Sequence, residues 1–409
     1  MMFETMKIAN LISEISMGPF GSNIKVECFV DEGIPVLNGS NLEGFALKED
    51  AFRYVTKEKA DSLGKANAHR GDVVITHRGT LGQIVFIPDN SKYERYVISQ
   101  SQFRVKCNEK ILPEYLVYYF HTRIGQHKLL SNASQVGVPA LARASTTFQT
   151  IEIEVPGIDI QHNIVDLLET IRKKIELNNA INDNLHQQCV ILVDHLLSEL
   201  TEFETLPLSK VADCQNGRAF YKEGYDEEGA FVIDLGNVNT SGNFIYTNAD
   251  KYVSLARYND PKLERYRVYQ NDLVMVMTDR KSTMELLGKT GKIYKPGYYL
   301  LNQRMYRIRA KQGMNTNYLY ACLNSTDVCN SLKEKALGSV QKYVNTGEIN
   351  SIQIKVPTSD KMEEIGNILD PIFLQMETNI LENESLIQMR DTLLPKLMSG
   401  ELDVSELDL

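Results

Sequence analysis

Apolar residues from position 164 to position 196 recur at alternating steps of four and three, the heptad spacing of a helix that packs against another helix. A second series with the same spacing begins 201 residues later and is interrupted only at Arg390. The two series are Ile164, Leu168, Ile171, Ile175, Asn178, Asn182, Leu185, Cys189, Leu192 and Leu196, and Ile365, Leu369, Ile372, Met376, Asn379, Asn383, Leu386, Arg390, Leu393 and Leu397. The sequence therefore predicts two copies of one long helix.

Each series carries two asparagines at core-facing positions. Because the long helices alternate with two large globular stretches, we expect the second helix to run back along the first, which pairs positions whose numbers sum to 561. Asn178 then faces Asn383, and Asn182 faces Asn379. A slip by one heptad would set a buried amide against an aliphatic side chain, at a cost of roughly 1–3 kcal/mol. We therefore predict that the asparagines specify the register. Two unrelated amphipathic helices are the alternative, and they would not explain ten matching positions.

The repeat extends into the globular stretches that precede the helices. Matching segments include 3–5 with 203–205, 33–42 with 229–238, and 70–74 with 270–274. The sequence predicts short strands and helices in each stretch, among them one continuous strand at Tyr96–Val105 and another at Tyr299–Ile308, and helices at Pro113–Thr122 and Asn317–Asn324.

We thus expect an α+β protein with two repeated domains, joined by a pseudo-two-fold antiparallel coiled coil. The expected boundaries are 1–157 for the first domain, 158–203 for the first long helix, 204–357 for the second domain and 358–409 for the second long helix. Pro371 has no counterpart in the first helix, so we expect the second helix to break or kink there.

Charge is distributed unevenly along the 409 residues, whose formal net charge is −9. The net charge is 0 over residues 1–157, −5 over 158–203, +5 over 204–357 and −9 over 358–409. Residues 257–311 carry a net +8, which is suited to phosphate contacts, although a merely solvated basic face gives the same count. The six cysteines form no C-x-x-C pair, and neither a secretion signal nor a long apolar run is present, so we expect reduced thiols, no membrane span and a cytoplasmic location.

Signals of catalysis are poor. The chain has no phosphate-binding loop, no dinucleotide-binding glycine motif and no H-E-x-x-H zinc motif. The segment from Asp370 to Phe373 approaches a DNA-methyltransferase motif, but its third residue differs and Ile372 occupies a core-facing heptad position. We therefore expect no catalytic residue, no metal site and no cofactor in this chain.

Amides, hydroxyls and basic side chains on loops beside the strands are the types that read the edges of DNA bases. Each of them singly is as readily a turn or surface residue. The candidate DNA-binding residues are Ser22, Asn38, Arg78, Thr80, Gln100 and Gln135 in the first domain, and Arg218, Asn237, Arg280, Lys281, Gln303, Gln341 and Lys342 in the second.

Over essentially its whole length the chain resembles the specificity subunits of type I restriction-modification systems. The resemblance rests on the order and two-fold repetition of several motifs. These are Gly18-Pro19-Phe20-Gly21-Ser22, the segment 71–76 with Arg78-Gly79-x-x-Gly82, Gln341-Lys342 before 352–357, and 394–402. The first domain departs from the pattern with Gln135-Val136 in place of Gln341-Lys342.

The resemblance implies a non-catalytic subunit whose two target-recognition domains each read one half of a bipartite site in double-stranded DNA. The helix pair would set the spacing between the halves and dock two methyltransferase subunits. Those partners would bind S-adenosylmethionine for adenine-N6 methylation, and restriction subunits would use ATP and magnesium for translocation and cleavage. The rival interpretation is a repeat scaffold that binds only proteins.

Overall fold

The computed structural model describes residues 3–134, 138–220, 224–246, 251–281, 283–339 and 341–404, apart from the side chains of Ser22 and Ser134. The chain forms two compact units. Unit 1 comprises Met1–Lys173 with Leu386–Leu409, and unit 2 comprises Lys174–Ser385. Each unit thus contains one globular domain and a part of each long helix.

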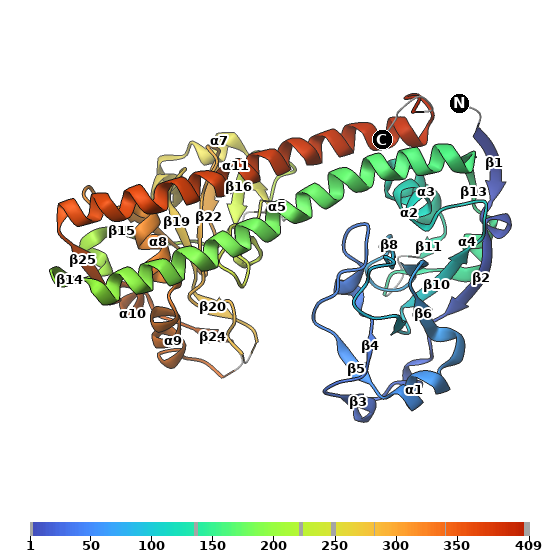
Figure 1. Cartoon of the computed structure of the whole chain (residues 1–409), viewed down its shortest axis with the longest axis horizontal. Helices are drawn as coiled ribbons and strands as arrows, with labels where there is room; N and C mark the ends of the chain where they lie inside the picture. Colours follow the sequence, from blue (N-terminus) through green and yellow to red (C-terminus); the bar gives the residue numbers. More distant parts are fainter. Residues whose placement is uncertain are drawn as a thin grey trace. The chain divides into compact units, whose positions relative to one another are not determined.

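Unit 1 contains two main sheets and the helices that pack on them (Figure 1). Its strands are β1 (Phe3–Lys7), β2 (Ile12–Met17), β3 (Phe29–Val30), β4 (Ile34–Val36), β5 (Arg53–Val55), β6 (Asn67–His69), β7 (Asp72–Thr76), β8 (Ile84–Phe86), β9 (Arg95–Val97), β10 (Gln102–Cys107), β11 (Ala133–Ser134), β12 (Ala140–Leu141) and β13 (Glu152–Pro156). Its helices are α1 (Lys57–Ser62), α2 (Pro113–His121), α3 (Arg123–Leu130), α4 (Ala144–Thr150) and the first part of α5 (Ile158–Glu199). The sheet orders are β2-β10-β7-β8 and β3-β5-β4-β9-β6.

Unit 2 repeats this plan. Its strands are β14 (Phe203–Pro207), β15 (Ala212–Asn216), β16 (Ala230–Ile233), β17 (Tyr252–Val253), β18 (Arg267–Val268), β19 (Leu273–Val276), β20 (Thr278–Asp279), β21 (Thr290–Lys292), β22 (Tyr299–Leu301), β23 (Met305–Ala310), β24 (Lys342–Tyr343) and β25 (Gln353–Pro357). Its helices are α6 (Leu208–Val211), α7 (Leu255–Tyr258), α8 (Thr316–Asn324), α9 (Thr326–Glu334), α10 (Thr346–Asn350) and most of α11 (Ser359–Met398). The sheet orders are β15-β23-β19-β21 and β17-β16-β22-β18.

The two domains share one fold, as the sequence repeat predicts. The order β15-β23-β19-β21 reproduces β2-β10-β7-β8, and in both domains one inner pair of the second sheet is parallel, β4 with β9 and β16 with β22. Even single contacts recur. The hydroxyl of Tyr115 donates to the carbonyl of Glu154, and that of Tyr318 donates to the carbonyl of Lys355. The α+β class and the predicted helices α2 and α8 are confirmed.

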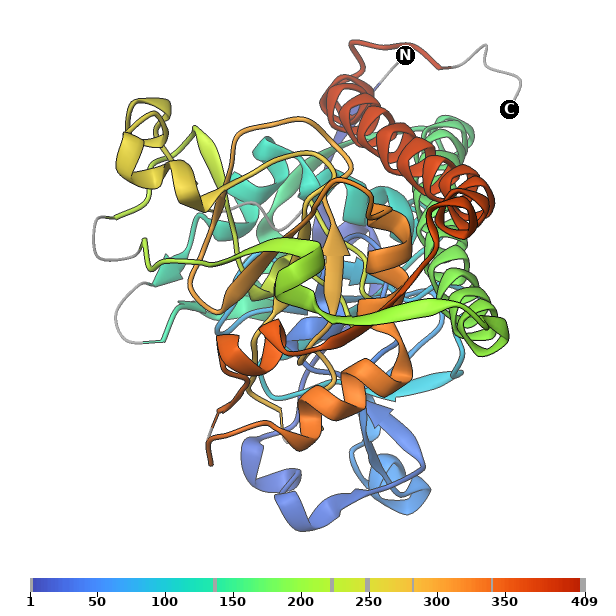
Figure 2. The same cartoon turned by 90° about the vertical axis from the view of Figure 1, so that its left-hand side faces the viewer.

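The long helices α5 and α11 lie side by side and antiparallel (Figures 1 and 2). In unit 2, Asn178 Nδ2 donates to Asn383 Oδ1 over 2.9 Å, and Asn379 Nδ2 donates to Asn182 Oδ1 over 2.8 Å. These are the pairs whose numbers sum to 561. All four asparagines are buried. That they select this register over a slipped one stays a prediction.

The structure differs from two sequence-based predictions about elements. The predicted break at Pro371 does not occur, because α11 is continuous through that residue, and a kink there stays a prediction. Pro371 is exposed, so the one carbonyl that loses its hydrogen bond can face water. Leu369 and Phe373 keep the buried face of the helix in the core. The predicted strand at Tyr96–Val105 is two strands, β9 and β10, and its counterpart is β22 and β23. Among the described residues no helix is long and apolar enough to cross a membrane.

Candidate functional site

The turns that split these strands lie at one edge of each domain, where several strand ends meet. In unit 2 the turn Asn302–Met305 joins β22 to β23, and Met305 N donates to the carbonyl of Asn302 over 3.3 Å. Three further backbone hydrogen bonds fix this edge. Met277 N donates to the carbonyl of Arg304 over 2.9 Å, Val344 N to that of Met277 over 3.0 Å, and Gly217 N to that of Met305 over 3.0 Å.

Unit 1 has the same edge. His77 N donates to the carbonyl of Ser101 over 2.9 Å, Leu141 N to that of His77 over 2.9 Å, and Gly18 N to that of Gln102 over 2.8 Å. The registers agree, because Thr76 pairs with Gln102 as Val276 pairs with Met305. Position 78 is therefore equivalent to 278, 100 to 303, and 101 to 304.

Gly18 and Gly217 permit the close backbone approach at this edge. A Cβ atom on Gly18 would lie 1.9 Å from the carbonyl oxygen of Ser99, and one on Gly217 would lie 1.8 Å from that of Asn302. No side chain fits at either position, so glycine is required at the end of β2 and of β15. This is the physical reason for Gly18 in the motif at 18–22.

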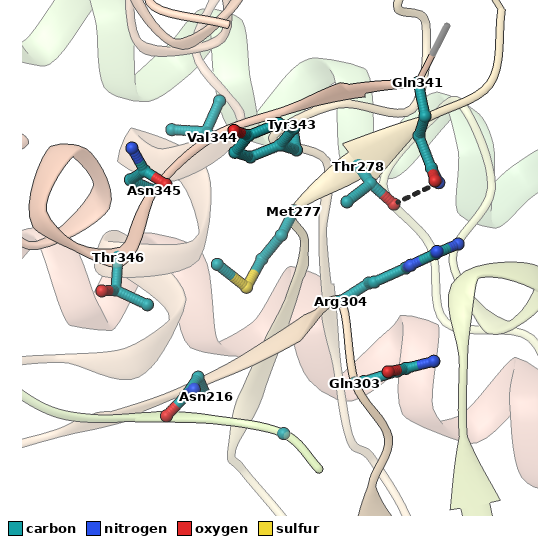
Figure 3. Close-up of a pocket in the computed structure, with 11 residues that line it drawn as sticks. Asn216, Met277, Thr278, Gln303, Arg304, Gln341, Tyr343, Val344, Asn345 and Thr346 are labelled. Atoms are coloured by element: carbon teal, nitrogen blue, oxygen red, sulfur yellow. Dashed lines mark hydrogen bonds between the residues drawn. The ribbon is translucent and has the colours of Figure 1, made fainter. Parts of the chain in front are cut away.

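At the edge of unit 2 lies a pocket of about 560 Å³. It is lined by Asn216, Gly217, Met277, Thr278, Gln303, Arg304, Gln341, Tyr343, Val344, Asn345 and Thr346. Gln341 Nε2 lies 3.4 Å from Thr278 Oγ1, to which it donates. Figure 3 shows the polar ends of Gln303, Arg304 and Gln341 on the same side of the pocket, with Met277 between the strands. The pocket thus gathers amides, a hydroxyl and a guanidinium, which donate to and accept from base edges.

The loop after β20 carries two of the predicted basic residues. The buried carboxylate of Asp279 accepts from the backbone N of Lys281 and of Leu286, both over 2.8 Å, and so holds the ends of the loop together. Arg280 is exposed, and its side chain has no hydrogen-bond or ion-pair partner among the described residues. Lys281 Nζ lies 3.4 Å from Glu285 in an exposed pair. Lys342 is half-buried in β24, opposite Asp279 in β20.

Arg218 and Asn237 differ in their environments. Arg218 is half-buried, with its guanidinium 5.2 Å from the ring centre of Phe220, and its backbone carbonyl accepts from Gln303 N over 2.8 Å. Asn237 is fully buried and ends the short helix 235–237. It donates to the carbonyl of Ile245 and accepts from the backbone N of Asp234. The prediction that Asn237 contacts DNA is therefore wrong, because its amide stabilises a turn.

In unit 1, Arg78, Thr80 and Gln100 are exposed, and Arg78 and Gln100 lie at the edge equivalent to the pocket. His77 Nε2 lies 3.1 Å from the carbonyl of Gln100, and burial lowers the pKa of His77. Asn38 is exposed but caps a short helix through Ser40 N, 2.8 Å away. Gln135 and the side chain of Ser22 lie outside the described residues.

Sequence reasoning found Gln303 and Gln341 but missed Arg304 between them in space. It also missed Tyr343, because nothing in the sequence shows that β24 pairs with β20. Asn216 at the end of β15 and Asn345 after β24 were missed as well. One signal in the sequence could have found Arg304, because it directly follows the candidate Gln303. Within the described parts of the chain, no cluster of histidine, cysteine, aspartate and glutamate could hold a metal ion.

The model of the type I restriction modification DNA specificity domain matches this chain twice, over residues 23–187 and 201–386. The chain belongs to this family. Among the curated relatives of this chain, the type I restriction enzyme MjaVIII specificity subunit of Methanocaldococcus jannaschii is 21% identical, over 76% of this chain and 76% of its own length. The HindI specificity subunit of Haemophilus influenzae is also 21% identical, over 81% of this chain and 87% of its own length.

Among solved structures, this chain is similar to the S subunit of a type I restriction-modification system from M. genitalium, with 15% sequence identity. The match covers 97% of this chain and 96% of that one, with a TM-score of 0.48.

Proposed function

We propose that this specificity-family chain reads a bipartite site in double-stranded DNA, with one half-site for each domain. The observation that carries the proposal is the edge built twice by the same backbone hydrogen bonds, at Met277 and at His77, and lined in unit 2 by base-reading side chain types. Two copies of one recognition edge suit two separated half-sites better than one continuous site.

The basic loop supports the same proposal. Arg280 and Lys281 are exposed beside a pocket whose amides can read bases. Phosphate contacts position a protein on DNA, and base contacts give it specificity, so an edge with both types is suited to sequence-specific binding. A scaffold that binds only proteins would need neither.

The chain itself is non-catalytic in this proposal, and the chemistry belongs to its partners in the cytoplasm. Two methyltransferase subunits would dock on it and supply S-adenosylmethionine for adenine-N6 methylation. Restriction subunits would supply ATP-driven, magnesium-dependent translocation and cleavage. The helices α5 and α11 would connect the recognition domains and set the spacing of the half-sites.

Mapping of methylated adenines in the host genome, with and without this gene, tests the proposal. We expect one motif to disappear on deletion, and we expect it to have two specified halves around an unspecified gap. A continuous motif would contradict one half-site for each domain. A methylome unchanged by deletion, together with no salt-dependent binding of the purified chain to duplex DNA, would instead favour the protein scaffold.

A further inference from the structure

Arg304 has an unusual backbone conformation for an arginine. It is the third residue of the turn Asn302–Met305, and its φ is +72°. Glycine or asparagine is usual at a turn position with positive φ, because a larger side chain is strained there. The turn is held in place by the hydrogen bond from Met277 N to the carbonyl of Arg304. Strain of this kind is found most often at functional sites.

The side chain of Arg304 is available to a ligand. It is exposed, and no hydrogen bond or ion pair to it occurs within the described ranges of the chain. Figure 3 shows its guanidinium between the amide ends of Gln303 and Gln341. The environment of Arg280 and Lys281 is different, because these two cations are adjacent to each other on an exposed loop. Amides donate and accept, whereas phosphate oxygens only accept, so the surroundings of Arg304 suit a base edge.

The equivalent edge of unit 1 carries an exposed arginine too, but on the neighbouring strand end. There, Arg78 follows β7 and Ser101 precedes β10, whereas in unit 2 Thr278 follows β19 and Arg304 precedes β23. The arginine and the short hydroxyl residue have exchanged places. Arg78 is likewise exposed and lacks a side-chain partner in the described part of the chain. Each domain therefore presents an exposed arginine at this edge, at a different point.

We propose that Arg304 determines specificity by binding the O6 and N7 atoms of one guanine in the major groove. A planar guanidinium with two parallel N–H donors matches these two acceptors, and no other base pair offers both at that position. The inference rests on the proposed function, because it names the base that the second domain reads at this edge. The half-site read by unit 2 thus contains a guanine whose recognition depends on Arg304.

Selection of random-sequence duplexes by the full-length protein in complex with its methyltransferase partners tests this inference. The variants are Arg304→Gly and Arg304→Asn, since both residues tolerate a positive φ and should preserve the turn. Lys210→Ala is the matched control. It removes an exposed cation from the same domain, just before β15, at the end of that strand opposite Asn216.

We expect both Arg304 variants to lose preference for guanine at one position of one half-site, and to bind the best duplex roughly 5- to 150-fold more weakly, as removal of one bidentate interaction with a base predicts. Every other position should be unchanged, as should the whole motif selected by Lys210→Ala. Equal weakening on all duplexes would show a phosphate contact and overturn the inference. So would a relaxed position that is not guanine, or an unaltered motif. If the unmodified protein selects no bipartite motif, the proposed function fails instead.

Discussion

At the scale of single residues, each domain keeps a buried aspartate at the N-terminal end of one inner strand, β7 or β19. Asp72 and Asp272 accept from the backbone N of His69 and Tyr269, over 2.9 and 2.8 Å. Their arginine partners differ, since Asp72 pairs with buried Arg104 at 3.2 Å and Asp272 with half-exposed Arg309 at 2.6 Å. Both domains thus keep the aspartate, but its arginine partner occupies a different position along β10 than along β23.

Arg104→Met should destabilise unit 1 by about 3–5 kcal/mol, because it leaves the buried carboxylate of Asp72 without a counter-charge. Urea denaturation followed by circular dichroism measures the change. Lys281→Met is the control, since it breaks an exposed pair with Glu285 and should cost about 0–1 kcal/mol. A similar loss for both variants would contradict the argument from burial.

The cost of Arg104→Met should depend on pH. Burial raises the pKa of Asp72 above its ordinary value, and the charge of Arg104 opposes that rise. Without Arg104, the folded-state pKa of Asp72 rises further. The penalty is then complete above that pKa and is relieved as the pH falls through it and the carboxylate becomes neutral. The difference in unfolding free energy between variant and wild type should therefore shrink on acidification, and a constant difference would argue against Asp72 as its source.

Arg280 and Lys281 should act on DNA through its phosphates. Replacing both with alanine should weaken binding to every duplex alike and flatten the dependence of log K on log salt by about one for each phosphate that is no longer neutralised. Binding titrations at several salt concentrations measure the slope. An unchanged slope with a relaxed preference at one base would assign these residues to base reading instead.

Sequence reasoning at this scale recovered residue types better than positions. Gln303 and Gln341 line the pocket, but Asn237 supports a turn. The three amides cannot be told apart in a sequence, because burial decides which of them faces solvent. Arg304 escaped notice for a physical reason too, since its turn position has neither the glycine nor the asparagine that usually marks a positive φ.

At the scale of elements, the antiparallel helix pair depends on how its buried amides are paired. Asn379→Leu removes the donor to Asn182 Oδ1 and leaves that buried oxygen unpaired, so it should cost roughly 1–3 kcal/mol. The double variant Asn182→Leu with Asn379→Leu places two aliphatic side chains opposite each other and should recover most of that loss. Urea denaturation compares them. The single variant Asn182→Leu completes the comparison, and if the double variant loses the sum of the two single effects, the asparagines do not act as a pair.

The helices were the most predictable elements, because their heptad pattern runs through both copies. Pro371 does not break α11, since a proline on an exposed face disturbs one hydrogen bond without removing the buried contacts of Leu369 and Phe373. The sequence predicted one strand where the structure has two, β9 and β10. Residues Ser99–Gln102, at their junction, are polar and form a turn, in which Gln102 N donates to the carbonyl of Ser99 over 3.1 Å. The two strands that this turn joins belong to different sheets.

At the scale of the whole molecule, the proposed function makes α5 and α11 set the distance between the half-sites. Duplicating residues 175–181 and 380–386 together inserts one heptad into each helix. Because these ranges are paired by the same sum of 561, the insertion repeats the Asn178–Asn383 layer and keeps amide against amide. Each helix lengthens by roughly 10 Å, which corresponds to about three base pairs of DNA at roughly 3.4 Å each.

Three added base pairs also rotate one half-site by roughly 100° around the duplex, so we expect reduced methylation. Any methylation that survives should keep both half-site sequences while the unspecified gap grows by about three base pairs, which methylome sequencing of the host reads directly. Duplicating 175–181 alone is the control, since it shifts one helix by a heptad against the other, separates Asn182 from Asn379 and should destabilise the pair. A doubly extended variant that folds and methylates at the original spacing would show that something other than these helices sets the distance.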